Sequence, residues 1–169
     1  MGGKIVLSSK QGVGSTFTVE IPLCIAENVS TEEKVKKEID LQGLRVLLTE
    51  DNDLNAEITV ALLEEKGMSV IRAVDGKSAL TQFCNTAPGT FDLILMDIMM
   101  PEMNGYETTK AIRNLQDRPD GKKIPVIAMT ANAFAEDVQA ALNAGMDDHV
   151  AKPVDMNVLI SVITKHIER

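Results

Sequence analysis

From residue 43 onward, short apolar runs alternate with longer amphipathic segments. The runs predict five strands, at residues 44–49, 68–73, 91–96, 124–129 and 148–150. Apolar residues recur at helical spacing between the runs, and the first such stripe contains Leu54, Ile58, Ala61 and Leu62. Strands that are apolar throughout are typical of a parallel sheet covered by helices on both faces. The pattern therefore predicts an α/β domain over residues 43–169.

Turn and cap residues predict where the remaining helices begin and end. The second helix is expected after Asp75 and Gly76, and the third after the loop at residues 101–105. A fourth apolar stripe that includes Phe134 ends at Gly145, and the fifth helix is expected to begin near Asp155, a candidate N-cap. A helix thus follows each predicted strand.

Residues 1–25 follow a different pattern, in which apolar and polar residues alternate as in a strand with one buried face. The run at residues 5–7 and the alternation at residues 16–21 flank glycines at 12 and 14, which predicts a β-hairpin. A hairpin alone is marginally stable in water, so we expect this piece to be the end of another domain. Residues 26–42 are charged and contain no glycine, and they predict a linker.

Composition narrows the class of protein. The 169 residues, 44% of them hydrophobic, are enough for one folded domain and an appendage. A net charge of -8 disfavours a basic surface for nucleic acid, so no nucleic-acid partner is expected. Cys24 and Cys84 lack metal-like spacing and predict free thiols in a reducing, cytoplasmic compartment. No run approaches the roughly 18 apolar residues of a membrane span, so any membrane anchor would belong to a longer parent protein.

Polar side chains stand at the ends of four of the predicted strands. Glu50 and Asp51 follow the first strand, Asp97 the third, Thr130 the fourth and Lys152 the fifth. The carboxyl ends of parallel strands meet at one edge of the sheet, where ligands of open α/β sheets bind. Three neighbouring carboxylates raise one another's pKa unless a cation joins them, and oxygen ligands of this kind suit Mg²⁺, with Mn²⁺ as a substitute. Helix capping alone would not account for Asp97.

Asp97 is the candidate nucleophile, because a carboxylate can accept a phosphoryl group to give an acyl phosphate. Thr130 can donate a hydrogen bond to a phosphoryl oxygen, and Lys152 offers a compact positive charge. Each residue taken alone is equally consistent with an ordinary strand-end or surface position. Their joint placement predicts a site for phosphoryl transfer, in which charge neutralisation and positioning supply most of the catalysis.

Four segments carry a family resemblance: LLTEDN at 47–52, LMDIMMPEMNG at 95–105, IAMTANA at 127–133 and VAKP at 150–153. Together they resemble the receiver domain of two-component response regulators, over residues 43–169. The resemblance implies a flavodoxin-like fold, with five parallel strands in the order 2-1-3-4-5. It also implies a cis peptide bond between Lys152 and Pro153.

The resemblance implies a role for each of the three neighbouring carboxylates, Glu50, Asp51 and Asp97. Asp97 would be the phosphorylated aspartate, and Asp51 would bind Mg²⁺ directly. Glu50 would act through a water molecule, and the backbone carbonyl of Met99 would complete the protein ligands. The side chains of Met99 and Asn132 fall where neighbours of the acyl phosphate influence its hydrolysis.

The resemblance further implies that Thr130 is the switch hydroxyl and Lys152 the lysine that pairs with the phosphoryl group. The position that often holds a switching Tyr or Phe is His149 here. An imidazole can fill the same pocket but adds polarity, so the sequence leaves open whether His149 switches or is a partly exposed histidine. The other histidine, His166, is expected to be solvated in the last helix.

The amino-terminal sequences MGGKI at 1–5 and SSKQGVGSTFTVEIPL at 8–23 resemble the closing strands of a histidine-kinase ATP-binding domain. The glycines at 12 and 14 open no helix, so a turn is expected there rather than an ATP site. Both resemblances together imply the carboxyl end of a hybrid sensor histidine kinase. This piece would catalyse only its own aspartate phosphorylation and dephosphorylation. The implied partner is the kinase's dimerisation and phosphoacceptor domain or a histidine phosphotransfer protein.

Three other functions fit the sequence less well. Aspartyl-nucleophile phosphatases typically carry a second acid two residues after the nucleophile, where this chain has Met99. A flavin-binding module would need a loop rich in Ser, Thr and Gly after the first strand, but residues 50–53 are Glu-Asp-Asn-Asp. An interaction domain that works without phosphorylation would not need the complete acidic set.

Overall fold

The computed structural model describes residues 3–22, 41–131 and 135–167. The chain separates into two compact units, Met1–Lys37 and Glu38–Arg169, and each unit is described by itself. The predictions made for Cys24, Asn132 and Phe134 fall outside the described residues. Cys84 is a free, exposed cysteine. Within the described ranges, none of the helices has the length and apolar character needed to cross a membrane.

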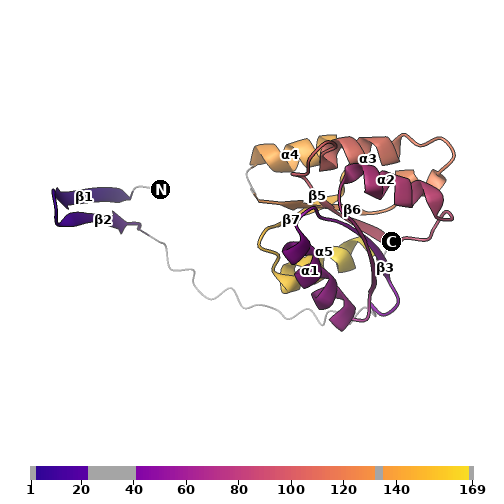
Figure 1. Ribbon diagram of the computed structural model, residues 1–169, viewed down its shortest axis with the longest axis horizontal. Coiled ribbons are helices and arrows are strands. Elements are labelled where there is room, and N and C mark those ends of the chain that lie inside the picture. Colours follow the sequence, from indigo (N-terminus) through magenta and orange to yellow (C-terminus); the bar gives the residue numbers. More distant parts are fainter. Residues whose placement is uncertain (1–2, 23–40, 132–134, 168–169) are drawn as a thin grey trace. The chain divides into compact units, whose positions relative to one another are not determined.

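The described part of the first unit, residues 3–22, is the predicted β-hairpin (Figure 1). Strand β1 (Lys4–Lys10) pairs with β2 (Gly14–Glu20) in antiparallel register. Ile5 lies opposite Val19 and Leu7 lies opposite Phe17, so these four side chains share one face of the hairpin. All four are exposed in the described part of the chain. The assignment of this unit to an ATP-binding domain stays a prediction.

The second unit is built on a five-stranded parallel sheet. Its strands are β3 (Arg45–Thr49), β4 (Ser69–Ala73), β5 (Leu93–Asp97), β6 (Val126–Thr130) and β7 (Asp148–Ala151). They run in the order β4-β3-β5-β6-β7, which is 2-1-3-4-5 when this sheet is counted by itself. The flavodoxin-like order implied by the resemblance is therefore confirmed. The predicted strands differ from the observed ones by one or two residues at their ends, so that Asp97 and Thr130 are the last residues of strands.

Helices cover both faces of this sheet, with α1 and α5 on one face and α2, α3 and α4 on the other (Figure 1). The helices are α1 (Asp53–Glu65), α2 (Gly76–Asn85), α3 (Gly105–Arg113), α4 (Ala135–Asn143) and α5 (Met156–Ile167), with a 3-10 turn, η1, at Pro119–Lys122. Capping side chains mark the starts of α2, α3 and α5. Asp75 and Asn104 form capping boxes at α2 and α3, and the Asp155 side chain accepts a hydrogen bond from the amide of Asn157 at the start of α5.

Two hydrophobic clusters lie on opposite faces of the sheet, because successive strand residues point to opposite sides. Leu47, Ile94 and Met96 pack with α2 and α3 on one face, where Phe83 and Ile112 are also fully buried. Alternate residues, which include Val46, Leu48, Leu93 and Leu95, pack with Leu63, Leu159 and Ile163 of α1 and α5 on the other face. This double burial is the physical reason why the strands read as continuous apolar runs.

Helix α1 is present as predicted, but the apolar stripe that predicted it does not cover the sheet. Leu54 is 65% exposed and Ile58 is 51% exposed. The buried residues of α1 are Ala56, Thr59 and Leu63. Because α1 carries apolar residues on more than one side, their spacing identifies a helix without identifying its inner face. The large side chains of the outer stripe are thus left on the surface.

His166 is not solvated, and the expectation from the sequence is wrong. Its side chain is buried, and its Nε2 lies 2.9 Å from Oδ2 of Asp148, the first residue of β7. Lys165 also donates to this oxygen at 2.7 Å, and the amide of His149 donates to Oδ1 at 2.9 Å. Burial raises the pKa of the Asp148 carboxyl, but these three hydrogen bonds outweigh it and hold the pKa at about 2. Asp148 therefore ties the end of α5 to the sheet.

Replacing Asp148 should destabilise the larger unit. Asp148→Asn removes the charge and turns an N–H toward groups that themselves donate, so we expect a loss of about 1–2 kcal/mol in the free energy of unfolding at neutral pH. A lowered carboxyl pKa stabilises the folded state above the ordinary pKa, and this contribution fades as the pH falls toward 2. Urea unfolding followed by circular dichroism measures the change.

The control is Lys165→Gln, which removes only the exposed ion pair between Lys165 and Asp148. We expect it to cost less than about 0.5 kcal/mol, because an exposed ion pair contributes little. Equal losses for the two variants would contradict the role given to the buried bond between Asp148 and His166.

Candidate functional site

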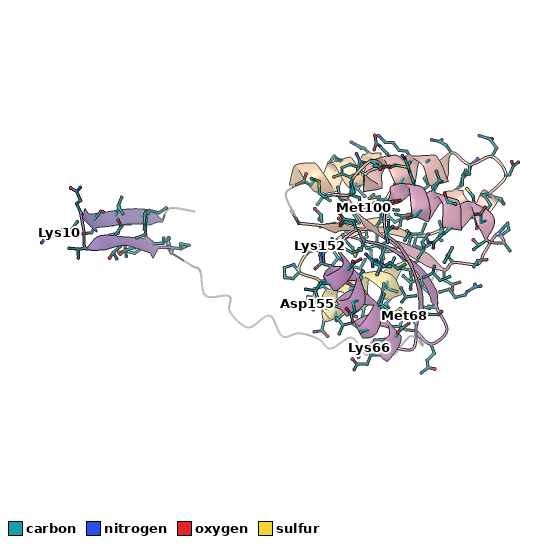
Figure 2. All side chains as sticks on the ribbon, in the orientation of Figure 1. Lys10, Lys66, Met68, Met100, Lys152 and Asp155 are labelled. Carbon is teal, nitrogen blue, oxygen red and sulfur yellow. The ribbon has the colours of Figure 1, made fainter. Side chains whose placement is uncertain are left out.

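The structure brings the predicted polar residues together at one edge of the sheet. Glu50 and Asp51 directly follow β3, and Asp97 is the last residue of β5. Thr130 is the last residue of β6, and Lys152 follows β7. Strands β3, β5, β6 and β7 are consecutive neighbours in the sheet, so their carboxyl ends lie side by side. In Figure 2, the labelled Lys152 and Met100, which both follow strands, lie toward one end of the unit and Lys66, at the end of α1, toward the other.

Three carboxylates form the centre of this site. Oxygen atoms of Glu50, Asp51 and Asp97 all lie within 4.8 Å of one another. Glu50 and Asp97 are buried, whereas Asp51 is exposed. The cluster is therefore closed toward the sheet and open toward solvent on the side of Asp51.

The ammonium group of Lys152 bridges the two buried acids. Its Nζ lies 2.6 Å from Oδ2 of Asp97 and 2.5 Å from Oε2 of Glu50. Burial alone would lower the pKa of Lys152, but the hydrogen bonds to Asp97 and Glu50 outweigh it and raise the pKa. Lys152 is accordingly a fixed positive charge, and its pairing with both acids offsets part of the free-energy cost of burying them.

Asp97 is the most unusual acid of the cluster. Its side chain is 4% exposed, and this burial raises the pKa of its carboxyl above the ordinary value. The bonds from Lys152 and from the Met99 amide, which donates to Oδ1 at 3.1 Å, offset only part of this effect. Each oxygen of Asp97 thus has one fixed donor, and the carboxylate is held in a single orientation at the end of β5.

Two residues that contact the acidic cluster were not identified from the sequence. Asn55, in the first turn of α1, donates from Nδ2 to Oε1 of Glu50 at 3.1 Å. Arg72, in β4, donates to the backbone carbonyls of Glu50 and Asp51. For Asn55, the sequence offered only a weak indication of this contact, because the predicted first helix begins close to Glu50 and Asp51. For Arg72 it offered none, because the strand order implied by the resemblance places β4 beside β3 but does not indicate which side chain of β4 reaches the loop after β3.

The remaining predicted residues surround the cluster. Thr130 is buried, and its carbonyl accepts a hydrogen bond from the Lys152 amide at 2.7 Å. The Lys152–Pro153 peptide bond is cis, as predicted. His149 lies in β7, which is separated by β6 from the strand that carries Asp97. Its side chain is about one-third exposed. The Met99 side chain is exposed, and the ligand role of its carbonyl and the switch role of His149 stay predictions.

A groove opens beside the acids, between α1 and the connection from β7 to α5. It has a volume of about 160 Å³ and is lined by Glu50, Asn55, Ile58, Thr59, Leu62, Lys152, Pro153 and Val154. The groove continues the outer apolar stripe of α1 up to the ammonium group of Lys152. A larger hollow of about 700 Å³ lies at the opposite edge of the sheet, near Asp92 and Lys123, and has no contact with the site.

The charges of the site fit a divalent cation. Three carboxylates against one ammonium leave two uncompensated negative charges at neutral pH, and the open side at Asp51 gives access to them. Acids this close repel one another unless a cation joins them. Lys152 lies within hydrogen-bond distance of the Asp97 carboxylate, and Thr130 ends the neighbouring strand β6.

The comparison with protein families matches residues 46–164 to the response regulator receiver domain. Among curated proteins, the aerobic respiration control sensor protein ArcB of Escherichia coli is 40% identical over 166 residues, which cover 98% of this chain and 20% of ArcB. The sensor histidine kinase GacS of Pseudomonas protegens is 39% identical over 72% of this chain and 13% of its own length. The chain therefore spans about a fifth or less of the length of these relatives.

Two solved structures have the same fold as the larger unit. One is the receiver domain of a sensor histidine kinase from Pseudomonas aeruginosa, which has a magnesium ion coordinated in its active site cleft; it is 35% identical, with a TM-score of 0.67, and the match covers 75% of this chain and 99% of that one. The other is the receiver domain of Ssk1 from Saccharomyces cerevisiae, crystallised with the histidine phosphotransfer protein Ypd1; it is 30% identical, with a TM-score of 0.66, over 74% of this chain and 89% of that one.

Neutralising Asp97 should change how the stability of the metal-free protein depends on pH. A raised carboxyl pKa means that ionisation costs folding free energy, so stability is lost as the pH rises through the raised pKa of Asp97. We therefore expect the free energy of unfolding of Asp97→Asn to rise relative to that of the wild type as the pH increases from 4 to 7.5. Thermal melts of both proteins in a metal chelator measure the difference.

Asp92→Asn is the control, because Asp92 is a partly buried acid that directly precedes β5, at the opposite edge of the sheet, and pairs with Arg45. Its free energy of unfolding relative to the wild type should not rise over this pH range. A difference between Asp97→Asn and the wild type that falls as the pH rises would show that the ion pair with Lys152 outweighs the cost of burial.

Proposed function

The chain belongs to the response regulator receiver domain family, and on that premise we propose that Asp97 accepts a phosphoryl group from a phosphohistidine in a two-component phosphorelay. One observation carries the proposal: the buried Asp97 carboxylate lies within hydrogen-bond distance of Lys152 and within the acidic cluster with Glu50 and Asp51. A nucleophile, a fixed cation and a set of metal-binding acids are the parts that phosphoryl transfer requires.

In the proposed step, one oxygen of Asp97 attacks the phosphorus atom of the phosphohistidine. A bond forms between that oxygen and phosphorus, and the bond between phosphorus and the donor nitrogen breaks, with its electron pair leaving on the imidazole. The products are an aspartyl phosphate and an unphosphorylated histidine. The Met99 amide and Lys152 orient the Asp97 carboxylate for attack, and Lys152 neutralises charge on the transferred group.

We propose Mg²⁺ as the metal, with Mn²⁺ able to replace it. Asp51, Asp97 and the Met99 carbonyl would hold the ion directly, since Asp51 is exposed and carboxylate oxygens suit a hard cation. Glu50 would act through water, because Lys152 and Asn55 already occupy its two oxygens. When bound, the ion neutralises negative charge on the acids and the phosphoryl group.

Phosphorylation would change the surface through Thr130 and His149. The Thr130 hydroxyl, at the end of β6, would donate to a phosphoryl oxygen, and the imidazole of His149 on β7 would fill the space that Thr130 leaves. The position of His149 supports this proposal, because it lies on β7, next to the strand that ends at Thr130, and its side chain is not fully buried. A new charge at Asp97 would drive the change.

The donor is proposed to be a helical domain that carries the histidine, either the kinase's own dimerisation and phosphoacceptor domain or a histidine phosphotransfer protein. The outer stripe of α1 supports this, because Leu54 and Ile58 are exposed and the groove beside them leads to Lys152. Exposed apolar side chains next to a reactive group are suited to docking a partner's apolar face.

We also propose that the parent protein is a cytoplasmically active hybrid sensor histidine kinase, with its membrane anchoring left to other parts of that protein. In it, residues 1–25 would close the ATP-binding domain, residues 26–42 would form a linker, and residues 43–169 would be the receiver. The alignment with ArcB supports this arrangement, because it covers 98% of this chain and so includes the hairpin as well as the receiver.

Acetyl phosphate and Mg²⁺ should phosphorylate the chain on Asp97. Intact-mass spectrometry should detect one added phosphoryl group in the wild type, none in Asp97→Ala, and none when a chelator removes the metal. Glu107→Gln, an exposed acid at the start of α3, is the control and should be modified like the wild type. Modification of Asp97→Ala to the wild-type extent would place the acceptor elsewhere and refute the proposal.

The docking face can be tested separately from the chemistry. The donor is a phosphorylated histidine phosphotransfer protein that modifies the wild-type chain. With this donor, Ile58→Glu should lower the rate of phosphoryl transfer by about tenfold or more, because a charge would be buried at the contact. It should leave the reaction with acetyl phosphate unchanged, since that donor needs no docking. Leu142→Glu, an equally exposed apolar residue on α4, is the control and should keep both rates. Equal rates for all three proteins would exclude the outer stripe of α1 as the docking face.

A further inference from the structure

Arg72 spans the loop that carries two of the three acids. It lies in the edge strand β4, with a side chain that is 25% exposed. Its Nε and Nη2 donate to the carbonyl of Glu50 at 3.2 and 3.0 Å, and Nη2 also lies 3.4 Å from the carbonyl of Asp51. Its Nη1 forms an ion pair with Asp53 at 2.8 Å. One guanidinium therefore contacts residues 50, 51 and 53 at once.

These contacts hold the backbone of Glu50 from both sides. The amide of Glu50 donates to the carbonyl of Ala73, the residue after Arg72, at 3.1 Å. Its carbonyl accepts the forked bond from Arg72. Arg72 is itself anchored, because its own carbonyl accepts a hydrogen bond from Gln82 of α2 at 3.1 Å. The peptide units that determine where the Glu50 and Asp51 side chains point are thus tied to β4 and, through it, to α2.

The side chain of Arg72 bonds to the backbone of the acidic loop and to Asp53. Among the described residues, its side-chain partners are backbone carbonyls and the carboxylate of Asp53, and none is a carboxylate oxygen of Glu50 or Asp51. The ion pair with Asp53 compensates the positive charge locally. The guanidinium can therefore orient the acidic loop while adding little repulsion toward a cation, a combination that its rigid, planar set of donors permits.

We propose that Arg72 is a positioning residue for the divalent metal, one that prepares the loop of Glu50 and Asp51 for binding. The proposal rests on the metal-dependent function proposed above. Residues that orient metal ligands without touching the metal commonly change metal affinity by 10-fold or more when they are replaced. Without Arg72, the loop after β3 would have to be ordered when the metal binds, and the affinity would fall.

Arg45 offers a matched comparison. It lies at the other end of β3, where it pairs with Asp92 at 3.2 Å and donates to the carbonyl of Gly89 at 2.7 Å. It therefore makes the same kinds of bond as Arg72, an ion pair and a bond to a loop carbonyl, but at the edge of the sheet away from the acids. An effect specific to metal binding should appear when Arg72 is replaced and not when Arg45 is replaced.

The test must separate orientation from charge. Arg72→Met alone leaves Asp53 unpaired, and the added negative charge attracts Mg²⁺ and offsets part of the loss. The double variant Arg72→Met with Asp53→Asn keeps the net charge, because one positive and one negative group are removed together. Asp53→Asn alone keeps the bonds to the carbonyls. Arg72→Lys keeps the positive charge but loses the pair of hydrogen bonds that the guanidinium donates to the Glu50 carbonyl.

Isothermal titration calorimetry with MgCl₂, on each folded variant, measures the dissociation constant for Mg²⁺ without any phosphoryl donor. We expect the double variant to bind Mg²⁺ about 10-fold more weakly than the wild type, and Arg72→Lys to lie between them. Arg45→Met and Asp53→Asn should stay within about twofold of the wild type. The phosphorylation rate with acetyl phosphate should show the same shift in the Mg²⁺ concentration for half-maximal rate, with a similar maximal rate at saturating Mg²⁺.

The outcomes separate this inference from the proposed function. Unchanged Mg²⁺ affinity in the double variant would overturn the role of Arg72, even if Asp97 is phosphorylated normally. An equal loss in Arg45→Met would overturn it too, because the effect would then be one of general stability. If the double variant does not fold, Arg72→Lys decides, and wild-type affinity in that variant would count against the inference. Absence of Mg²⁺ binding by the wild type would refute the metal-dependent function itself.

Discussion

The larger unit depends on the ammonium group of Lys152, which is shared by two buried carboxylates. Glu50 and Asp97 lie at the ends of different strands and would repel each other strongly in a buried site. Lys152 compensates one negative charge, and the cluster that remains still carries an excess of two when Asp51 is included. The fold therefore maintains a site that is stable enough to form and still attracts a divalent cation.

The parallel sheet allows the site to be built from single residues at the ends of strands. Each strand buries apolar residues on both faces and then ends at the same edge, so a single polar residue at the end of a strand joins the others without a long loop. Hydrophobic burial on two faces supplies the stability that the charged edge lacks. The cost is visible at Asp97, where burial raises the pKa of the carboxyl.

The two sides of helix α1 differ in what they contact. Its inner side is narrow, and Ala56, Thr59 and Leu63 pack against the sheet. Its outer side exposes Leu54 and Ile58 beside the groove that leads to the acids. Helix α5 shows the opposite case, because the polar residue His166 is turned inward to the carboxylate of Asp148. In both helices, the neighbours in space and not the local sequence decide which side is buried.

The sequence by itself determined the order of strands and helices, the hairpin and the polar residues at the strand ends. These depend on local patterns: continuous apolar runs, helical spacing and capping side chains. Only the tertiary structure decided which side of α1 faces the sheet, that His166 is buried, and that Asn55 and Arg72 contact the acidic loop. Such contacts form between residues that are distant in the sequence and become neighbours in the folded sheet. Arg72 reaches the loop only because β4 is hydrogen-bonded to β3. A local pattern cannot encode that neighbour, because the energy of the contact exists only once the sheet has formed.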